Sequence, residues 1–326
     1  MTAPVPIRPP VIETRDLRRT FKSRSGPIAA VRGVDLTVGQ GEIFGFLGPN
    51  GAGKTTTLRM LATLIAPTAG DATVAGADLR REPQLVRQRI GYVPQGGSTD
   101  PAETGRGELV LQGRLYRMSR RDAERRAAEV LAALELEAAA DRKIGTYSGG
   151  MKRRLDVGLG IVHEPTVLFL DEPTTGLDPQ ARARMWDEIR KLRERGTTVF
   201  LTTHYLEEAD ALADRLAIID HGEIVAAGTS AELKRAVAGD VVEIGVNGAG
   251  ERVLALLERL PFVRDAAHDD GLVRLYVEFG DHAVPQLLRL LDGAGLAPTS
   301  IAVHKPSLDD VFLRQTGRSL REEPAA

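Results

Sequence analysis

The chain has 326 residues, no cysteine, and only 4% aromatic residues. The absence of cysteine excludes disulfides, thiol nucleophiles, and zinc or iron–sulfur sites ligated by cysteine. The six histidines never stand three or four residues apart, so no helical histidine pair is available to a metal. The 43 Lys and Arg nearly balance the 45 Asp and Glu, which argues against a dedicated nucleic-acid-binding protein.

Long apolar segments are missing as well. No run reaches the roughly 18 apolar residues that a membrane-spanning helix needs. The opening residues, MTAPVPIRPP, lack the apolar stretch of a signal peptide. We therefore expect a soluble globular protein without a membrane span, and its length favours two domains.

The first expected domain covers residues 11–230, after a flexible, proline-rich arm over residues 1–10. Short apolar runs alternate there with helical stretches, which is typical of an α/β domain with a parallel sheet. A helical subdomain is expected at about 100–160, because Arg, Ala, Glu and Leu replace the strand pattern between roughly 104 and 143. The runs expected to form buried strands are 43–47, 167–170, 199–201 and 216–219.

The second expected domain covers residues 239–315, followed by a tail over 316–326. Its pattern is strand, helix, strand, turn, strand, helix, strand, which predicts a small α+β domain of the ferredoxin-like βαββαβ type. The expected bounds are a strand at Val241–Val246, a helix at about 250–260, a strand at about 262–267, a turn at 269–271, a strand at Val273–Phe279, a helix at about 282–292 and a strand at about 299–303. Ser307 and Asp310 have the spacing of a capping box and predict a last short helix through Arg314.

A phosphate-binding loop is predicted where the strand at 43–47 ends. The residues fit the pattern G-x-x-x-x-G-K-[ST] between a strand and an amphipathic helix, the context that this motif requires. Its glycines allow consecutive N–H groups to converge on phosphates, Lys54 neutralises the oxygens, and Thr55 can hold Mg²⁺. The nucleotide-binding candidates are Gly48, Pro49, Asn50, Gly51, Ala52, Gly53, Lys54, Thr55 and Thr56.

Two carboxylates follow the strand at 167–170. Asp171 is the candidate Mg²⁺ ligand, and Glu172 is the candidate general base for the attacking water. A helix cap is the alternative explanation for such a pair. Gln95, where a loop leaves a strand, can contact both the metal and the water, and alone it would be an ordinary loop residue.

A second anion site is predicted at Ser148, which precedes two glycines at the start of a helix. One nucleotide does not need two such sites on one chain. Either this is a well-capped helix, or it contacts the γ-phosphate held by another subunit. His204, which follows a strand, would then reach the γ-phosphate as a catalytic group; a structural cap is the alternative.

These motifs resemble those of the nucleotide-binding subunits of ATP-binding-cassette (ABC) transporters over about residues 11–230. GPNGAGKTT at 48–56 resembles Walker A, and LFLDEP at 168–173 resembles Walker B. Gln95 resembles the Q-loop residue and His204 the switch histidine. The resemblance implies a P-loop ABC-type ATPase that uses ATP and Mg²⁺. Further candidates are signature residues Ser148, Gly149, Gly150 and Met151, D-loop residue Asp178, and Phe21 as an aromatic stacked on adenine.

Some positions depart from the family pattern or have a second explanation. Tyr147 and Met151 replace the commoner Leu and Gln of the signature, while Ser148 and its two glycines remain. TGRGEL at 104–109 is similar to the usual TGRENL and lies where such proteins meet their membrane partner. Asp178 followed by proline also fits a helix N-cap, and Phe21 also fits a core position.

The C-terminal segment SLDDVFL at 307–313 resembles the daunorubicin-resistance type of ABC exporter ATPase. This resemblance implies an ATPase subunit of an exporter of hydrophobic drugs or natural products. It further implies a homodimer of ATPase subunits, a separate integral-membrane permease, and a peripheral location at the cytoplasmic face of the cell membrane. Two ATP molecules would lie between Walker A of one chain and the signature of the other.

Other functions are less well supported. A GTPase lacks its N-K-x-D motif here, and too few residues separate Lys54 from Ser148 for the coiled coil of a chromosome-maintenance ATPase. The main alternative is a soluble, non-transport ABC ATPase that remodels a macromolecule. A third possibility is a non-catalytic drug-binding or immunity module in residues 239–315, with Glu172 and His204 counting against it.

Overall fold

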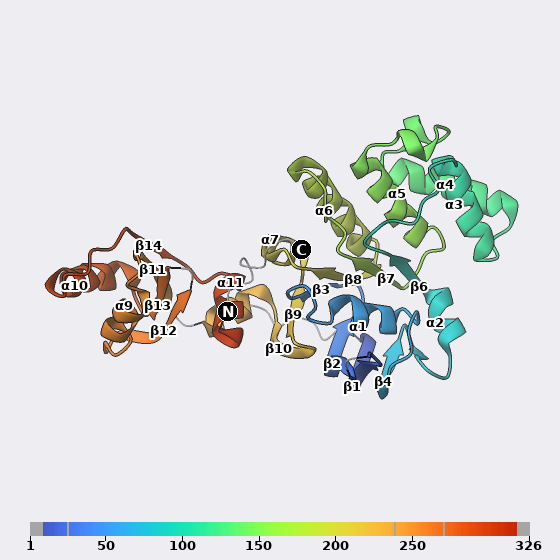
Figure 1. Ribbon diagram of the computed structural model, residues 1–326. Helices are drawn as coiled ribbons and strands as arrows, with labels where there is room; N and C mark the ends of the chain where they lie inside the picture. Colours follow the sequence, from blue (N-terminus) through green and yellow to red (C-terminus); the bar gives the residue numbers. More distant parts are fainter. Residues whose placement is uncertain (1–8, 25, 238, 270, 318–326) are drawn as a thin grey trace. The chain divides into compact units, whose positions relative to one another are not determined.

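The computed structural model describes residues 9–24, 26–237, 239–269 and 271–317 (Figure 1). The chain divides into two compact units between Ile224 and Val225, and each is described by itself. The expected arm over 1–10 lies outside the described residues except for its last two prolines. The tail over 316–326 lies outside them beyond residue 317.

A six-stranded sheet forms the centre of the first unit. Its five strands from β9 to β6 pair in parallel, as the apolar runs predicted. All four runs expected to be buried strands are strands, and the turn at His221 leads into β10. The order is β10 (Glu223–Gly228), β9 (Arg215–Asp220), β3 (Ile43–Leu47), β8 (Thr198–Thr203), β7 (Val167–Asp171) and β6 (Ile90–Val93).

Both faces of this sheet are buried. One face contributes a phenylalanine cluster in which the ring centroid of Phe200 lies 5.6–5.7 Å from those of Phe44, Phe46 and Phe169. This face packs against α1 (Lys54–Leu61) and a smaller antiparallel sheet. The other face packs against helices that include α5 and α6. Such double burial explains the unbroken apolar runs in the sequence.

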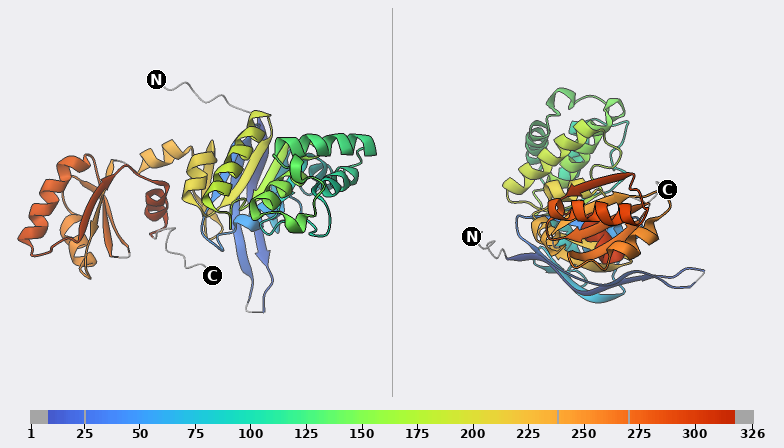
Figure 2. Two further views of the ribbon diagram at one scale, coloured as in Figure 1. Left: turned by 90° about the horizontal axis from the view of Figure 1, so that it is seen from above. Right: turned by 90° about the vertical axis from the view of Figure 1, so that its left-hand side faces the viewer.

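The antiparallel sheet was not predicted as a separate layer. Its order is β2 (Ile28–Gly39), β1 (Pro10–Phe21), β4 (Ala69–Val74) and β5 (Ala77–Asp78). Strands β1 and β2 are 12 residues long and pair along their whole length. Figure 2 shows them extending as a two-stranded ribbon.

The predicted helical insert is present, and Figure 1 shows α3, α4 and α5 lying together. Side chains of Thr104 and Ser119 cap α3 and α4 by accepting backbone N–H bonds. Within the described ranges, none of the helices combines the length and apolarity that crossing a membrane requires. The helices of this unit beyond α1 are α2 (Pro83–Arg89), α3 (Gly105–Leu115), α4 (Arg120–Ala133), the short 3₁₀ turns η1 (Glu137–Ala139) and η2 (Ile144–Thr146), α5 (Gly149–Ile161), α6 (Pro179–Glu194) and α7 (Leu206–Leu212).

The second unit has the predicted ferredoxin-like topology. Its antiparallel sheet has the order β12-β13-β11-β14, with α9 and α10 packed on one face. The predicted capping box of Ser307 and Asp310 opens α11. The elements are β11 (Asp240–Gly245), α9 (Gly250–Leu257), β12 (Val263–Asp269), β13 (Leu272–Val277), α10 (Gly280–Gly293), β14 (Ser300–His304) and α11 (Leu308–Thr316).

Two local features of this unit differ from the predictions. Helix α8 (Ser230–Ala236) was not predicted, although Thr229 and Glu232 form a capping box at its start. Strand β13 ends at Val277 instead of continuing to Phe279, because Phe279 already serves as the N-cap residue of α10. Part of the predicted turn, residue 270, lies outside the described residues.

Close packing of β6 against α5 generates a stability prediction. A Cβ atom added to Gly91 would lie 2.0 Å from the carbonyl oxygen of Gly160, whereas one added to Gly96 would meet nothing within 4 Å. We expect Gly91→Ala to lower the free energy of unfolding by about 1–3 kcal/mol, because two backbones would have to separate. Urea unfolding monitored by circular dichroism measures the change. Gly96→Ala is the control, and equal stability of the two variants would contradict the packing.

Candidate active site

The phosphate-binding loop joins the end of β3 to the start of α1. Gly51 and Gly53 have positive φ angles of 79° and 103°, which lets the backbone curl. A Cβ on Gly53 would also lie 2.5 Å from the carbonyl oxygen of Ala30. The loop opens onto a cavity of about 190 Å³, lined by Ala30, Pro49, Asn50, Gly51, Gly53, Lys54, Thr55, Thr56, Gln95 and Glu172.

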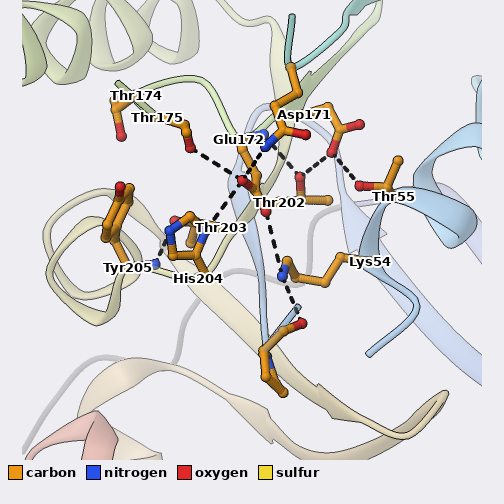
Figure 3. Close-up of polar contacts among 12 residues, drawn as sticks. Lys54, Thr55, Asp171, Glu172, Thr174, Thr175, Thr202, Thr203, His204 and Tyr205 are labelled. Carbon is orange, nitrogen blue, oxygen red and sulfur yellow. Dashed lines mark hydrogen bonds and ion pairs between the residues drawn. The ribbon is translucent and has the colours of Figure 1, made fainter. Parts of the chain in front are cut away.

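Lys54 is a buried cation at the floor of this cradle, with 4% of its surface exposed. Its Nζ donates to the carbonyl oxygens of Gly48 and Pro49 at 2.7 and 2.9 Å. It also lies 3.6 Å from Glu172 Oε1 (Figure 3). The arrangement places a positive charge where the helix N-terminus adds its own partial charge, which favours an anion.

Asp171 lies at the end of β7 and is almost fully buried. Its Oδ1 accepts hydrogen bonds from Thr55 Oγ1 at 3.0 Å and from Thr202 Oγ1 at 2.7 Å (Figure 3). Strands β7 and β8 and the helix that follows β3 thereby contribute to one polar cluster, because parallel pairing places the carboxyl ends of β3, β8 and β7 at the same edge of the sheet. The contribution of Thr202 was not predicted from sequence, where it is one threonine in an apolar strand.

Glu172 stands at the centre of the site in Figure 3 and has a positive φ of 46°. Its backbone N–H donates to the carbonyl and hydroxyl oxygens of Thr202 at 3.2 and 3.1 Å. Its Oε2 accepts from Gln95 Nε2 at 2.7 Å and from Thr175 Oγ1 at 3.2 Å. The strained backbone aims the carboxylate into the cradle, and these bonds hold it there.

The charge of Glu172 depends on these neighbours. Burial raises the pKa of the Glu172 carboxyl, but the imidazole of His204, the ammonium of Lys54 and the hydroxyl of Thr175 together outweigh burial. Its pKa therefore lies below the ordinary value, and the group is a carboxylate at neutral pH. A carboxylate is the form that a general base requires.

His204 follows β8, and its imidazole also approaches the Glu172 carboxylate. Its Nδ1 lies 3.3 Å from Glu172 Oε2 without the geometry of a hydrogen bond. The ring packs on Tyr205 with centroids 4.0 Å apart, and the Arg182 guanidinium lies over the Tyr205 ring. The Tyr205 ring thus restricts the orientations that are open to the imidazole.

Glu208 is a buried carboxyl near the site that sequence analysis missed. Its Oε1 accepts from Thr174 Oγ1 at 2.8 Å and from Trp186 Nε1 at 3.1 Å. Burial raises its pKa. The contacts tie the loop after Glu172 to α6 and α7, so Glu208 supports the architecture around the base. Glu207 and Glu208 are consecutive acidic residues, a pattern typical of an exposed helix turn, so the sequence gave no sign that Glu208 is buried.

The predicted signature residues lie apart from the cradle. They line a second cavity of about 360 Å³, which has no residue in common with the cradle among the described residues. Ser148 caps α5 and Asp178 caps α6, each by accepting a backbone N–H bond. The lining residues are Ser148, Gly149, Gly150, Met151, Arg154, Gly176, Leu177, Asp178, Gln180, Ala181 and Arg184.

Tyr147 shows what the departure from the usual signature does. Its ring is 5% exposed, and its hydroxyl donates to the carbonyl oxygen of Ala139 at 2.6 Å. A Cβ on Gly105 would lie 2.6 Å from the same hydroxyl. Tyrosine therefore anchors the start of the signature to the helical insert, and the neighbouring serine and glycines keep their place.

Phe21 is not among the residues that line the cradle. It ends β1, pairs with Ile28, and has the guanidinium of Arg19 4.5 Å from its ring centroid. The structure thus brings together Lys54, Thr55, Gln95, Asp171, Glu172 and His204 at one site. The signature residues with Asp178, and Phe21, lie elsewhere.

A third cavity lies between α2, α3 and α4 and is referred to below as the α2–α4 groove. Its volume is about 820 Å³. Tyr116 and His163 stack in its wall with centroids 3.5 Å apart. Its other lining residues are Gln84, Arg87, Gln88, Gln112, Leu115, Arg117, Met118, Arg125, Arg126, Val162 and Glu164.

Two family models match the chain. Residues 31–175 match the ABC transporter model, which includes the cradle, Gln95 and the signature. Residues 228–316 match the model of the C-terminal domain of DrrA1-3-like ATP-binding proteins. The two matches fall on the two units of the structure.

Curated relatives match along almost the whole chain. The daunorubicin resistance ATP-binding protein DrrA2 of Streptomyces coeruleorubidus is 46% identical over 91% of this chain and 93% of its own length. The linearmycin resistance ATP-binding protein LnrL of Bacillus subtilis is 38% identical over 93% of this chain and 98% of its own length. The Nod factor export ATP-binding protein I of Burkholderia lata is 41% identical over 93% of this chain and 97% of its own length.

Among solved structures, the dimeric ATP-binding cassette MJ0796, bound to ADP and Pi in a post-hydrolysis state, superposes with a TM-score of 0.61. It is 28% identical to this chain and covers 67% of it and 98% of its own length. With the phosphate cradle, the carboxylate at its edge and relatives that span both units, the chain belongs to the ABC transporter ATP-binding proteins of the DrrA type and is an ATPase.

Proposed function

We propose that the chain hydrolyses ATP with Glu172 as general base. In this proposal His204 contacts the γ-phosphate, and Gln95 contacts Mg²⁺ and the attacking water. The observation that carries this proposal is the convergence of Lys54, Gln95 and His204 on the Glu172 carboxylate. Lys54 exchanges loop carbonyls for phosphate oxygens, and Glu172 accepts the proton of the attacking water. Loop N–H groups of residues 48–56 bind the phosphates, and Phe21 stacks on the adenine.

Mg²⁺ fits the oxygen donors at the edge of the cradle. Thr55 Oγ1 and Asp171 Oδ1 lie 3.0 Å apart, and Gln95 adds an amide oxygen nearby. Among the described residues no cluster of three His, Cys, Asp or Glu could hold a metal alone. Mg²⁺ commonly binds through one or two protein oxygens together with phosphates, which such a donor set suits. Bound there, it would neutralise charge on the phosphates.

We further propose that two chains pair head to tail, so that the signature cavity of one faces the nucleotide of the other. The separation of the signature residues from the cradle within one chain supports this pairing. Ser148, Gly149 and Gly150 offer a hydroxyl and helix N–H groups to the γ-phosphate. Met151 and Asp178 complete that face.

The transport activity that we propose is export of hydrophobic drugs or natural products through a separate permease. DrrA2 and LnrL are resistance proteins, and the Burkholderia protein is named for Nod factor export. Their cargo names differ although all three match both units of this chain. We infer that cargo specificity lies in the permease.

We place the permease contact at the α2–α4 groove. Leu115 on its rim is 70% exposed, and Arg87 and Arg117 add positive charge to the lining. Arg125 and Arg126 also line the groove and form ion pairs with Glu129. An amphipathic cytoplasmic loop with apolar and acidic side chains suits that lining. Docking there holds the chain at the cytoplasmic face of the membrane. Within this scheme residues 11–230 act as the motor, and residues 239–315 form a separate domain.

Glu172→Gln is expected to lower the ATP turnover number by about 10²–10⁴-fold, because glutamine cannot accept the proton. Nucleotide affinity is expected to stay unchanged, since Lys54 and the loop remain. Phosphate release and binding of a fluorescent ATP analogue measure the two quantities. Glu194→Gln, on an exposed position of α6, is the control. Turnover of Glu172→Gln near the wild-type rate would show that Glu172 is not the general base.

Ser148→Arg is expected to prevent ATP-dependent pairing, because a bulky cation would fill the signature cavity. Sedimentation velocity with ATP should give dimers for Glu172→Gln and monomers for the double variant. Binding of ATP to the monomer should be the same in both. Loss of ATP binding by the monomer would contradict a contact made in trans.

Leu115→Asp is expected to release the chain from membranes, because it places a charge on the apolar rim of the α2–α4 groove. ATP turnover of the isolated chain should not change. The fraction of tagged chain that sediments with host membranes measures the effect. Leu64→Asp is the matched control, since Leu64 is 53% exposed outside the groove. Equal membrane fractions for the two variants would argue against this docking face.

A further inference from the structure

Arg153 is a buried arginine on α5, just over one turn after the signature serine that caps this helix. Only 7% of its surface is exposed. Burying a guanidinium costs free energy unless its N–H groups are paired. Its partners therefore decide what it does in the fold.

The partners are backbone carbonyls on both sides of the catalytic carboxylate. Nε donates to Pro173 O at 2.8 Å, and Nη2 donates to Asp171 O at 3.0 Å and Glu172 O at 3.3 Å. These three carbonyls span the turn in which Glu172 has its positive φ. A rigid planar fork of donors can bind them together, which an ammonium group cannot.

The fourth carbonyl belongs to the loop that carries Gln95. Arg153 Nη1 donates to Pro94 O at 2.6 Å, directly before Gln95. Asp156, three residues along α5, accepts from Ser98 N–H at 3.0 Å on the other side. A Cβ on Gly97 would lie 3.0 Å from Asp156. Helix α5 thus holds the Gln95 loop at both ends.

We propose that Arg153 is a positioning residue that fixes Gln95 and the Glu172 turn relative to the signature helix. This inference rests on the proposed function, in which Glu172 is the base and α5 begins at the contact with the partner's nucleotide. A shift of α5 when the partner's nucleotide binds moves the backbone that aims both side chains. Occupancy of one site is in this way transmitted to the chemistry of the other.

The test uses the full chain with Arg153→Met, which keeps apolar volume but removes all four hydrogen bonds. The turnover number is expected to fall on the order of 10²-fold, the cost of misplacing reacting groups by about 1 Å. Affinity for a fluorescent ATP analogue is expected to change less than about twofold, because Arg153 makes no contact with the phosphate-binding loop. Arg153→Lys should behave like Arg153→Met, since it keeps the charge but loses the fork.

Arg89→Met is the matched control, because Arg89 also donates to a backbone carbonyl, that of Ala75, away from the site. Its turnover is expected to stay within about twofold of wild type. Asp156→Ala gives a second test if Arg153→Met does not fold. It should lower turnover without changing ATP affinity, because it releases the Ser98 end of the Gln95 loop.

A double variant separates positioning from general damage. If Arg153 acts by positioning Glu172 and Gln95, adding Arg153→Met to Glu172→Gln should lower the residual single-turnover rate by a much smaller factor than Arg153→Met lowers the wild-type rate. Two results would overturn the inference: a further loss in the double variant by the same factor as in Arg153→Met alone, or a turnover number of Arg153→Met equal to that of Arg89→Met. In either case, low turnover of Glu172→Gln would still support Glu172 as the general base. Full activity of Glu172→Gln would overturn the base assignment itself, and with it the route through which Arg153 acts.

Discussion

The site depends on one constraint, which is that the carboxylate of Glu172 must be held charged although this residue is buried. Glu172 meets it through a backbone angle that side-chain-bearing residues seldom adopt. Gln95 and Thr175 donate to its carboxylate, Lys54 forms an ion pair with it, and its own backbone N–H donates to Thr202. The parallel sheet makes the convergence possible. Its register places Leu47 beside Thr203 and Asp171 beside Thr202, so the loops after β3, β7 and β8 leave the sheet together.

The same geometry explains why, in our proposal, one chain cannot complete a nucleotide site without the signature residues of a second chain. Residues proposed to bind phosphate and to activate the attacking water lie at the edge of the sheet, whereas the signature residues lie at the start of α5 and line another cavity. Arg153 and Asp156 connect the two regions through backbone carbonyls and an N–H group, not through side chains that touch phosphate. Motion of α5 can therefore change the position of the base without moving the phosphate-binding loop.

Sequence patterns predicted the parallel strands and the ferredoxin-like unit because double burial and regular alternation leave clear marks. The Walker-type loop was equally clear, since its glycines and Lys54 serve no simple packing purpose. The β1–β2 ribbon was missed because its strands mix buried and exposed positions. Arg153 was missed because it stands in a Lys-Arg-Arg run that is typical of a solvated face, and only packing against β7 reveals its burial.

The central claim is that ATP hydrolysis by this chain powers a membrane permease. The most direct test is a pull-down of tagged Glu172→Gln, with ATP, from detergent-solubilised membranes of the native host. The account predicts recovery of a membrane protein with many spans, in an amount close to that of the tagged chain. Recovery of soluble ribosomal or DNA-associated proteins alone would contradict it and would favour an ATPase that remodels another macromolecule.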